Sequence, residues 1–331
     1  MIGETQTGEV LALAYTGRLE LATQRANEYA EFSSAGQFAG WAIAKIMDGV
    51  AATHSGRFRD AIRSIEQALA ALNAESSLPW QLPGRLLLAR AYAGVGNPAD
   101  AERVLEDAKE HSGEFMALHE PLRMIAKAWV AAAKGGHRSA IDLARAAADA
   151  AHSSGQYAVE AEALHSAARF GDRSVTRRLQ ELVDRVDGPL PALFARHAAA
   201  VAAADPVELD KVSGAFEEAG LLLSAADSAA QAVPLHDKAG HRRNNTESAA
   251  HALQLASKCG GAATPAIRSA ARPLPVTGRE REVAGLVAQG LSNREIAERL
   301  IVSVRTVEGH IYRACIKLGV ADRDELAKIV W

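Results

Sequence analysis

The chain has 331 residues, of which 48% are hydrophobic, 5% aromatic and 23% charged. This composition excludes a wholly disordered chain and a membrane protein, and the length corresponds to about two domains. The apolar content depends on alanine and leucine more than on β-branched residues, which favours a mostly helical protein, and a net charge of −3 argues against a surface that is basic throughout.

The N-terminus has no basic segment followed by an apolar one, and no stretch approaches the roughly 20 apolar residues that cross a membrane. We therefore expect a cytoplasmic protein that does not bind a membrane. The two cysteines, Cys259 and Cys315, are too few for a disulfide scaffold or a four-thiolate zinc site, so we expect reduced thiols.

Four glycines mark a repeat in the first half of the chain. Gly17, Gly56, Gly96 and Gly135 are 39 or 40 residues apart, and each is followed five positions later by alanine. Helical stretches rich in small residues precede each glycine, and amphipathic ones such as residues 60–69 follow it. A glycine between two helices permits a left-handed cap, so each unit is expected to be a helical hairpin. Such hairpins bury their apolar faces only by stacking, which predicts an α-solenoid.

The repeat resembles tetratricopeptide-like repeats, although its period is nearer 40 than 34 residues. Looser hairpins are expected from 153 to 258, and the helical body is predicted to span residues 1–258. A concave solenoid surface typically binds a peptide, a protein or a small effector, and a purely structural spacer is the alternative. Three tryptophans are expected in the solenoid core or groove: Trp41, Trp80 and Trp129.

Three histidines near the end of the body are candidates for a metal site. His236, His241 and His251 are separated by spacings of five and ten residues, which do not place them on one helix face, and Gly240 lies between the first two. The sequence therefore predicts no metal and no cofactor.

Glycine, proline and small residues interrupt the helical pattern after Lys258, so residues 259–275 are expected to be a linker and residues 276–331 a second domain. From Arg272 to Trp331 there are ten Lys/Arg and eight Asp/Glu, a net +2, which leaves −5 for the remainder of the chain. This is the charge distribution of an acidic body with a mildly basic tail domain.

Four short helices are predicted in the second domain. Thr277 with Glu280, and Ser292 with Glu295, have the spacing of capping boxes and start the first two. Ser303 follows a short turn and is expected to cap a third helix, from about Val304 to Leu318. Gly319 closes that helix, and Asp322 caps a short fourth one. The arrangement is a helix-turn-helix.

The same segment closely resembles the LuxR/FixJ-type DNA-binding domain. The resemblance depends on Thr277, Arg279, Glu280, Glu282, Val283, Gly290, Ser292, Glu295, Ile296, Ala297, Leu300, Ser303, Thr306, Val307, His310, Lys317, Leu318, Gly319, Val320, Arg323, Glu325 and Leu326. The body resembles the C-terminal half of large ATP-binding (MalT-like) LuxR regulators. The sequence has no Gly-x-x-x-x-Gly-Lys-Ser/Thr phosphate loop, no His-Glu-x-x-His and no Gly-x-Ser-x-Gly, so we expect no enzyme and no catalytic residues.

The third helix of a helix-turn-helix lies in the DNA major groove. The resemblance implies that Glu308, Gly309 and Tyr312 face base edges. At the position of Glu308 the relatives often have lysine, whereas glutamate would accept from cytosine N4. The residues expected to contact or support the DNA backbone are Asn293, Arg294, Arg305, Thr306, His310, Arg313 and Lys317.

Each of these positions has a structural alternative. Arg305, Arg313 and Lys317 could form a solvated face, His310 a structural hydrogen bond, and Tyr312 a cover for its own helix. Cys315 is expected to fill the domain core, together with Val307, Ile311, Ala314 and Leu318.

These patterns predict a transcriptional regulator that binds double-stranded DNA, with a sensing or interaction body that responds to a protein or small-molecule effector. Dimerisation on DNA is expected through the fourth helix, at Glu325, Leu326, Ile329 and Val330, because one small domain with few phosphate contacts binds weakly. The alternative is a non-enzymatic solenoid adaptor that acts by binding proteins.

Overall fold

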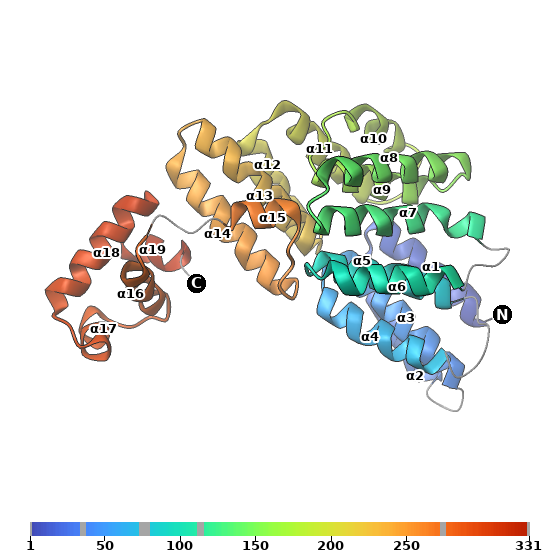
Figure 1. The fold of residues 1–331 in the computed structure, drawn as a ribbon, viewed down its shortest axis with the longest axis horizontal. Helices are drawn as coiled ribbons and strands as arrows, with labels where there is room; N and C mark the ends of the chain where they lie inside the picture. Colours follow the sequence, from blue (N-terminus) through green and yellow to red (C-terminus); the bar gives the residue numbers. More distant parts are fainter. Residues whose placement is uncertain (1, 34–37, 73–79, 111–115, 272–275, 330–331) are drawn as a thin grey trace.

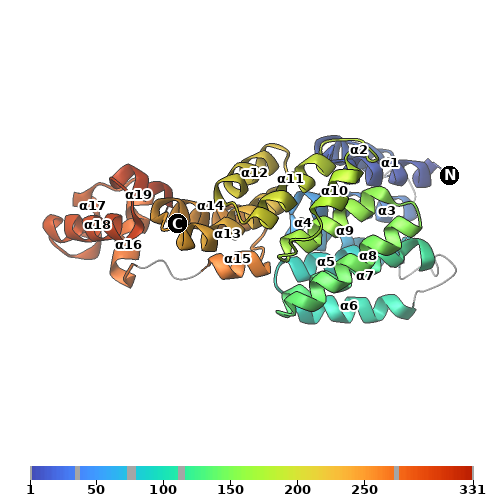
Figure 2. The same cartoon turned by 90° about the horizontal axis from the view of Figure 1, so that it is seen from above.

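The computed structural model describes residues 2–33, 38–72, 80–110, 116–271 and 276–329. These residues form nineteen α-helices and no strand, so the all-helical prediction is confirmed. The molecule is elongated, with the four C-terminal helices at the end opposite the N-terminus (Figures 1 and 2). None of the helices in the described ranges has the length and apolar character needed to cross a membrane.

The first eight helices pair as four hairpins. Their turns contain Gly17, Gly56, Gly96 and Gly135, with φ between +78° and +86°, the left-handed conformation that glycine adopts without strain. The hairpins predicted from the glycine repeat are therefore confirmed. They are α1 (Ile2–Thr16) with α2 (Leu19–Ser33), α3 (Phe38–Ser55) with α4 (Phe58–Leu72), α5 (Gln81–Gly94) with α6 (Pro98–Glu110), and α7 (Met116–Ala133) with α8 (His137–Ser153).

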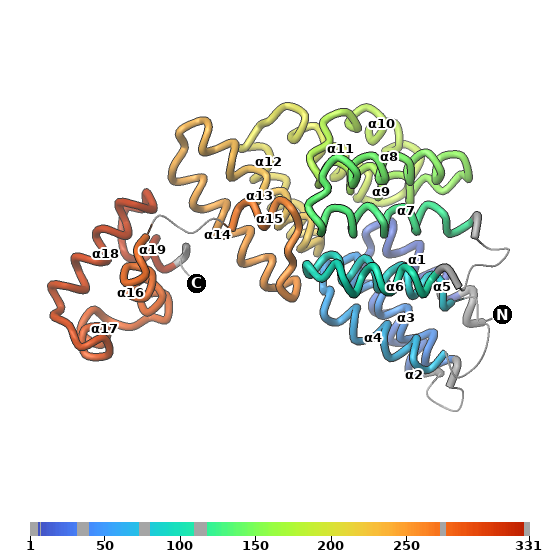
Figure 3. Tube along the Cα trace, in the orientation of Figure 1, coloured from blue at the N-terminus to red at the C-terminus, as the bar shows by residue number. Residues whose placement is uncertain are grey.

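Seven further helices complete the body, and the trace in Figure 3 follows them toward the C-terminal helices. Gly220 and Gly240, again with positive φ, form turns of the looser hairpins expected in this half. The helices are α9 (Tyr157–Arg169), α10 (Thr176–Leu182), α11 (Leu190–Ala203), α12 (Pro206–Glu218), α13 (Leu222–Lys238), α14 (Arg242–Lys258) and α15 (Pro265–Ala270).

Helix α15 lies inside the segment expected to be a linker. The Thr264 side chain caps it by accepting from the backbone N–H of Ile267 at 3.2 Å, and Pro265 occupies its first position. Ile267 and Ala270 are buried in the core of the body, as is Cys259. The expected linker 259–275 is therefore too long, because residues up to Ala270 belong to the body. The glycines that interrupt the helical period, Gly260 and Gly261, precede this short helix, and the proline opens it. Residues 272–275 lie outside the described part of the chain.

The two halves of the body pack on each other through the glycine turns. Helix α1 contacts α9 and α11, and the backbone N–H of Ala263 donates to the carbonyl of Gly94 at 2.9 Å. A Cβ at Gly17 would lie 2.6 Å from Leu190 Cγ, and one at Gly56 2.9 Å from Leu223 Cβ. The solenoid therefore curls so that its odd-numbered helices face a shared interior.

Trp129 lies in that interior and is 2% exposed. Its ring makes edge contacts with Phe58 and Phe170, and the Arg169 guanidinium lies 4.6 Å from its centroid. Trp129 therefore lies in the core of the solenoid. The sequence had left both the core and the groove open for the three tryptophans. Trp41 and Trp80 are partly buried against a smaller cluster around Ile46 and Leu72.

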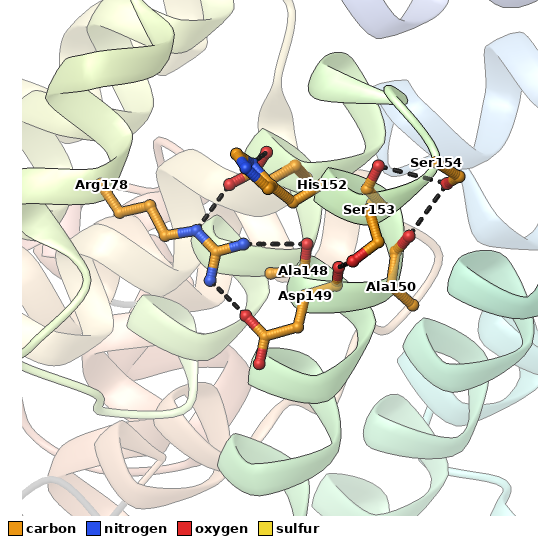
Figure 4. Close-up of polar contacts among 9 residues, drawn as sticks. Ala148, Asp149, Ala150, His152, Ser153, Ser154 and Arg178 are labelled. Atoms are coloured by element: carbon orange, nitrogen blue, oxygen red, sulfur yellow. Dashed lines mark hydrogen bonds and ion pairs between the residues drawn. The ribbon is translucent and has the colours of Figure 1, made fainter.

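A guanidinium joins three helices of the middle of the body (Figure 4). Arg178 of α10 donates to the Ala148 carbonyl of α8 at 3.0 Å, and it pairs with Asp149 and Glu160 at 2.5 Å each. Glu160 of α9 has a side chain only 1% exposed, and its other oxygen lies 2.9 Å from His152 Nδ1. The cation lies near the C-terminal end of α8, where the helix dipole favours it, and fixes α10 against the hairpin.

Replacing Gly94 by alanine should destabilise the body. A Cβ there would lie 2.2 Å from Cε2 of Phe58, which is fully buried. We expect the variant to lose about 1–3 kcal/mol of unfolding free energy in urea denaturation, despite the better helix propensity of alanine. The matched control is Gly214→Ala in α12, where nothing lies within 4 Å and a small gain is expected. Equal effects at the two positions would contradict the packing argument.

Candidate nucleic-acid interface

The four C-terminal helices begin and end where the sequence predicts. They are α16 (Gly278–Ala288), α17 (Asn293–Leu300), α18 (Val304–Leu318) and α19 (Arg323–Ile329). Both capping boxes are formed, and the Ser303 side chain caps α18. Ile301 has φ +54° and turns the chain between α17 and α18, and Gly319, at φ +71°, ends α18.

The inner face of α18 is the one expected. Val307, Ile311, Ala314, Cys315 and Leu318 are all buried, in a core shared with α16, α17 and α19. Burial raises the pKa of the Cys315 thiol. The thiol is therefore a core group, as predicted.

The positions predicted to read bases lie on the opposite face of α18. Glu308 is exposed and the Tyr312 side chain projects into solvent with 67% of the residue accessible. Gly309 is half-buried, and a Cβ there would lie 3.5 Å from a guanidinium nitrogen of Arg313. The three residues thus share one side of an accessible helix.

Lys317 and Arg313 both approach a buried carboxylate. Glu280 is 2% exposed and accepts from the backbone N–H of Thr277 and from Lys317 Nζ, both at 2.7 Å. Arg313 Nε lies 3.5 Å from its other oxygen. The hydrogen bond from Lys317 is the largest cause, and with the bond from Thr277 it lowers the pKa of Glu280 to about 2. Lys317 therefore has a structural role in addition to any contact with DNA.

The other residues expected to contact the DNA backbone differ in their exposure and in the bonds they already make within the domain. Arg305 is exposed in the first turn of α18, and Arg294 is exposed with Glu298 at 3.2 Å. Asn293 accepts a hydrogen bond from Arg323, which ties α17 to α19. Thr306 shares a 2.7 Å hydrogen bond with Ser303 Oγ at the helix start.

His310 is half-buried beside Arg313, whose Nη2 lies 3.2 Å from the His310 Nδ1 atom. Burial lowers the pKa of His310, and the neighbouring cations Arg313 and Arg279 act in the same direction. The ring is therefore a neutral acceptor that positions Arg313 on the outer face.

Three apolar residues of this surface were missed from the sequence. Ile301 is 92% exposed, Ile316 60% and Val304 39%. Ile316 follows Glu308 and Tyr312 at four-residue intervals, so the outward register of α18, continued for one more turn, would have found it. An exposed apolar group beside positions that are predicted to read bases can contact a thymine methyl.

The helix predicted to mediate dimerisation faces the body. Glu325 Oε1 lies 2.9 Å from Arg243 Nη2 of α14, and Ala250 of α14 packs into the domain core. Leu326 is fully buried in that core and so does not point toward a partner. Ile329 is the last residue of α19, and Val330 lies outside the described residues.

The histidines considered for a metal take other partners. His236 Nε2 lies 2.7 Å from Asp210, and His251 Nε2 lies 2.9 Å from Glu217. Across the described ranges no group of three or more His, Cys, Asp or Glu side chains is placed to hold a metal ion.

Comparisons with known proteins identify the C-terminal domain. Residues 274–330 match the family described as bacterial regulatory proteins, luxR family. An HTH-type transcriptional regulator of Mycobacterium bovis is 51% identical over 51 residues, which are 15% of this chain and 6% of that protein. The oxygen regulatory protein NreC of Staphylococcus aureus is 48% identical over 50 residues, 23% of its length. The match thus spans a small part of each relative, and the resemblance of the body to the large regulators stays a prediction.

Proposed function

Because the C-terminal domain is a LuxR-family helix-turn-helix DNA-binding domain, we propose that this protein is a sequence-specific transcriptional regulator. The observation that carries the proposal is the outer face of α18, where Glu308, Gly309 and Tyr312 stand free of the domain core. In the major groove these residues meet base edges. The body serves as the sensing part, and the protein acts in the cytoplasm.

Phosphate contacts in this proposal come from Arg305 and Arg294, with Arg313 and Lys317 flanking them. Arg305 and Arg294 are exposed, and the latter lies at the N-terminal end of α17, where backbone N–H groups also favour an anion. His310 supports Arg313 through its hydrogen bond. Asn293 and Thr306 hold the starts of α17 and α18 through their bonds with Arg323 and Ser303.

We further propose that the protein binds DNA as a homodimer through α19. In this structure α14 covers part of that helix, and Arg243 holds Glu325. A dimer that uses Glu325 must therefore break this ion pair, and Leu326 contributes only through the core beneath it.

The proposal is tested by selecting binding sites from randomised duplexes with the full chain. Salt-sensitive recovery of a defined sequence supports it. Recovery of no preferred sequence at any ionic strength would contradict it and would favour the alternative, a solenoid adaptor that acts by binding proteins.

Replacing Glu308 by lysine should change the preferred base at one position of the site. A glutamate accepts from cytosine N4, whereas lysine donates to guanine, and each such contact discriminates by about 1–3 kcal/mol. The exposed side chain leaves the fold intact when it is replaced. The same randomised-site selection measures the change, and an unaltered preference would show that Glu308 does not read a base.

Replacing Arg305 by alanine should weaken binding to all sequences alike, because a phosphate contact carries no base information. The slope of log affinity against log salt should fall by about one. The control is Arg177→Ala in the body, with a 91% exposed side chain far from α18 along the chain. A loss confined to one sequence would instead make Arg305 a base-reading residue.

A further inference from the structure

The guanidinium of Arg313 lies one helical turn before its own backbone, over Gly309. A Cβ at Gly309 would lie 3.5, 3.8 and 3.9 Å from the Arg313 atoms Nη1, Nη2 and Cζ. The side chains of a helix lean toward its N-terminal end, so a long side chain covers the position four residues earlier. Because that position is a glycine, the Arg313 head occupies the place where a side chain at 309 would begin.

Two neighbours orient this head. Arg313 Nη2 lies 3.2 Å from His310 Nδ1, and Nε lies 3.5 Å from Glu280 Oε1. The Glu280 carboxylate has a closer cation in Lys317, whose Nζ lies 2.7 Å from Oε2. The contact between Arg313 and Glu280 is therefore a long one that orients the guanidinium and leaves it free to bind elsewhere. A side chain that is already held in place loses less conformational freedom on binding.

The oriented guanidinium keeps donors for a further partner. A guanidinium has five N–H donors in a planar fork. In the part of the chain that the structure describes, Nη2 directs one toward His310 and Nε directs one toward Glu280. Both hydrogens of Nη1 and one of Nη2 remain, and 53% of the side chain is exposed. Two donors on neighbouring nitrogens match the O6 and N7 acceptors that guanine presents in the major groove.

The position of the head favours a base edge over a phosphate. Gly309 lies between Glu308 and Tyr312 on the outer face of α18, the face that meets the bases in the proposed function. A recognition helix contacts base edges with its N-terminal residues, and the lean of the side chain carries the Arg313 head one turn toward that end. Gly309 has no side chain to offer a base. The Arg313 guanidinium takes its place among the base-facing groups.

We propose that Arg313 reads a guanine of the DNA site by donating from Nη1 and Nη2 to O6 and N7, with His310 and Glu280 as positioning residues and Gly309 as the space for the head. The inference rests on the proposed function and deepens it. It assigns Arg313, which the sequence suggested as a backbone contact, to a base, and it adds a guanine to the cytosine proposed for Glu308.

The experiment uses the full chain and the duplex recovered by randomised-site selection. Each guanine of that duplex is replaced in turn by 7-deazaguanine, which lacks the N7 acceptor and still pairs with cytosine. The unaltered chain should bind one of these duplexes about fivefold more weakly or worse than the parent duplex. The variant Arg313→Ala should bind that duplex and the parent equally, because the group that reads N7 is gone. Equal binding of the unaltered chain to the parent and to every substituted duplex would overturn the inference.

A phosphate contact by Arg313 gives a different result. In that case Arg313→Ala weakens binding to all sequences alike, lowers the salt slope by about one and leaves the guanine preference unchanged, and the inference is wrong. The control Arg177→Ala, in the body, should change neither the affinity nor the preference. Recovery of no preferred sequence by the unaltered chain would contradict the proposed function as well, whereas a preferred sequence whose guanine is unaffected by Arg313→Ala contradicts this inference alone.

The variant Gly309→Leu tests the placement of the head with Arg313 still present. The new side chain fills the place where the guanidinium lies, so the variant should lose the preference for the same guanine. An unchanged preference would show that the head does not act from its position over Gly309. Circular dichroism checks that the variant is folded. Should it fail to fold, the comparison of Arg313→Ala with the unaltered chain decides, because that side chain is more than half exposed.

Discussion

Replacing Arg169 by methionine is expected to lower the free energy of unfolding by about 3–5 kcal/mol, the usual cost of leaving a buried charge without its partner. Arg169 Nε donates to Asp227 Oδ2 at 2.7 Å, and both residues are 5% exposed or less. Burial raises the pKa of Asp227 even with the guanidinium beside it. Urea denaturation monitored by circular dichroism measures the loss.

The control is Arg177→Met. Arg177 pairs with Glu181, and its side chain is 91% exposed. An exposed pair of this kind contributes about 1 kcal/mol or less to the free energy of unfolding. The double variant Arg169→Met with Asp227→Asn should be more stable than Arg169→Met alone, because it also removes the stranded charge. If Arg169→Met lowers the free energy of unfolding no more than the control does, the Arg169–Asp227 pair does not stabilise the interior of the body.

The second large effect is a loss of stability in mild acid. His165, His197 and Gln231 form a directed hydrogen-bond chain. Gln231 Nε2 donates to the carbonyls of Ala168 and Arg169, so its oxygen accepts from His197 Nε2 at 2.8 Å. His197 Nδ1 then accepts from His165 Nε2 at 3.0 Å. Both ring nitrogens of His197 are therefore engaged, and a second proton on His197 Nδ1 would oppose the N–H of His165.

Burial lowers the pKa of His197 to about 4, and that of His165 falls well below its usual value for the same reason. In the unfolded chain both histidines titrate near 6.5. Below that pH the unfolded state therefore binds more protons than the folded state does. Stability should therefore be highest above about pH 6.5 and should fall as the pH drops toward 4. His197 by itself contributes about 3 kcal/mol of this loss.

Unfolding free energies at pH 7 and pH 5 measure the effect. The variant His197→Gln should show a smaller difference between the two than the unaltered chain, and His137→Gln, at an exposed position of α8, should show the same difference. A difference that is unchanged in His197→Gln would contradict the assignment of acid sensitivity to this chain of residues.

The sequence alone predicted those features that depend on neighbouring residues. The four glycine turns, both capping boxes, the span of α18 and its buried face are all as expected. Each depends on groups within about four residues of one another, since helix hydrogen bonds, caps and left-handed turns are local.

The expected linker is a segment whose structure the local sequence did not predict. Residues 259–270 have the composition of a linker, yet Ile267 and Ala270 are buried and Thr264 donates to the distant Asp227. A six-residue helix has too few residues for a periodic signal, and it is stabilised by contacts far along the chain. The position of α19 against α14 also depends on contacts far along the chain, because the paired residues Arg243 and Glu325 are 82 positions apart.

The amino-acid sequence by itself determined that this protein is a helical repeat body followed by a helix-turn-helix, and which face of α18 is free. Only the tertiary structure decided that the body curls on itself and that Tyr15, His54, Arg90 and Glu162 meet in its interior. These residues come from four helices and are separated by up to 147 positions, with Arg90 and Glu162 72 positions apart. Nothing in the local sequence of any one helix marks these residues as neighbours, and only the closure of the solenoid brings their polar groups together.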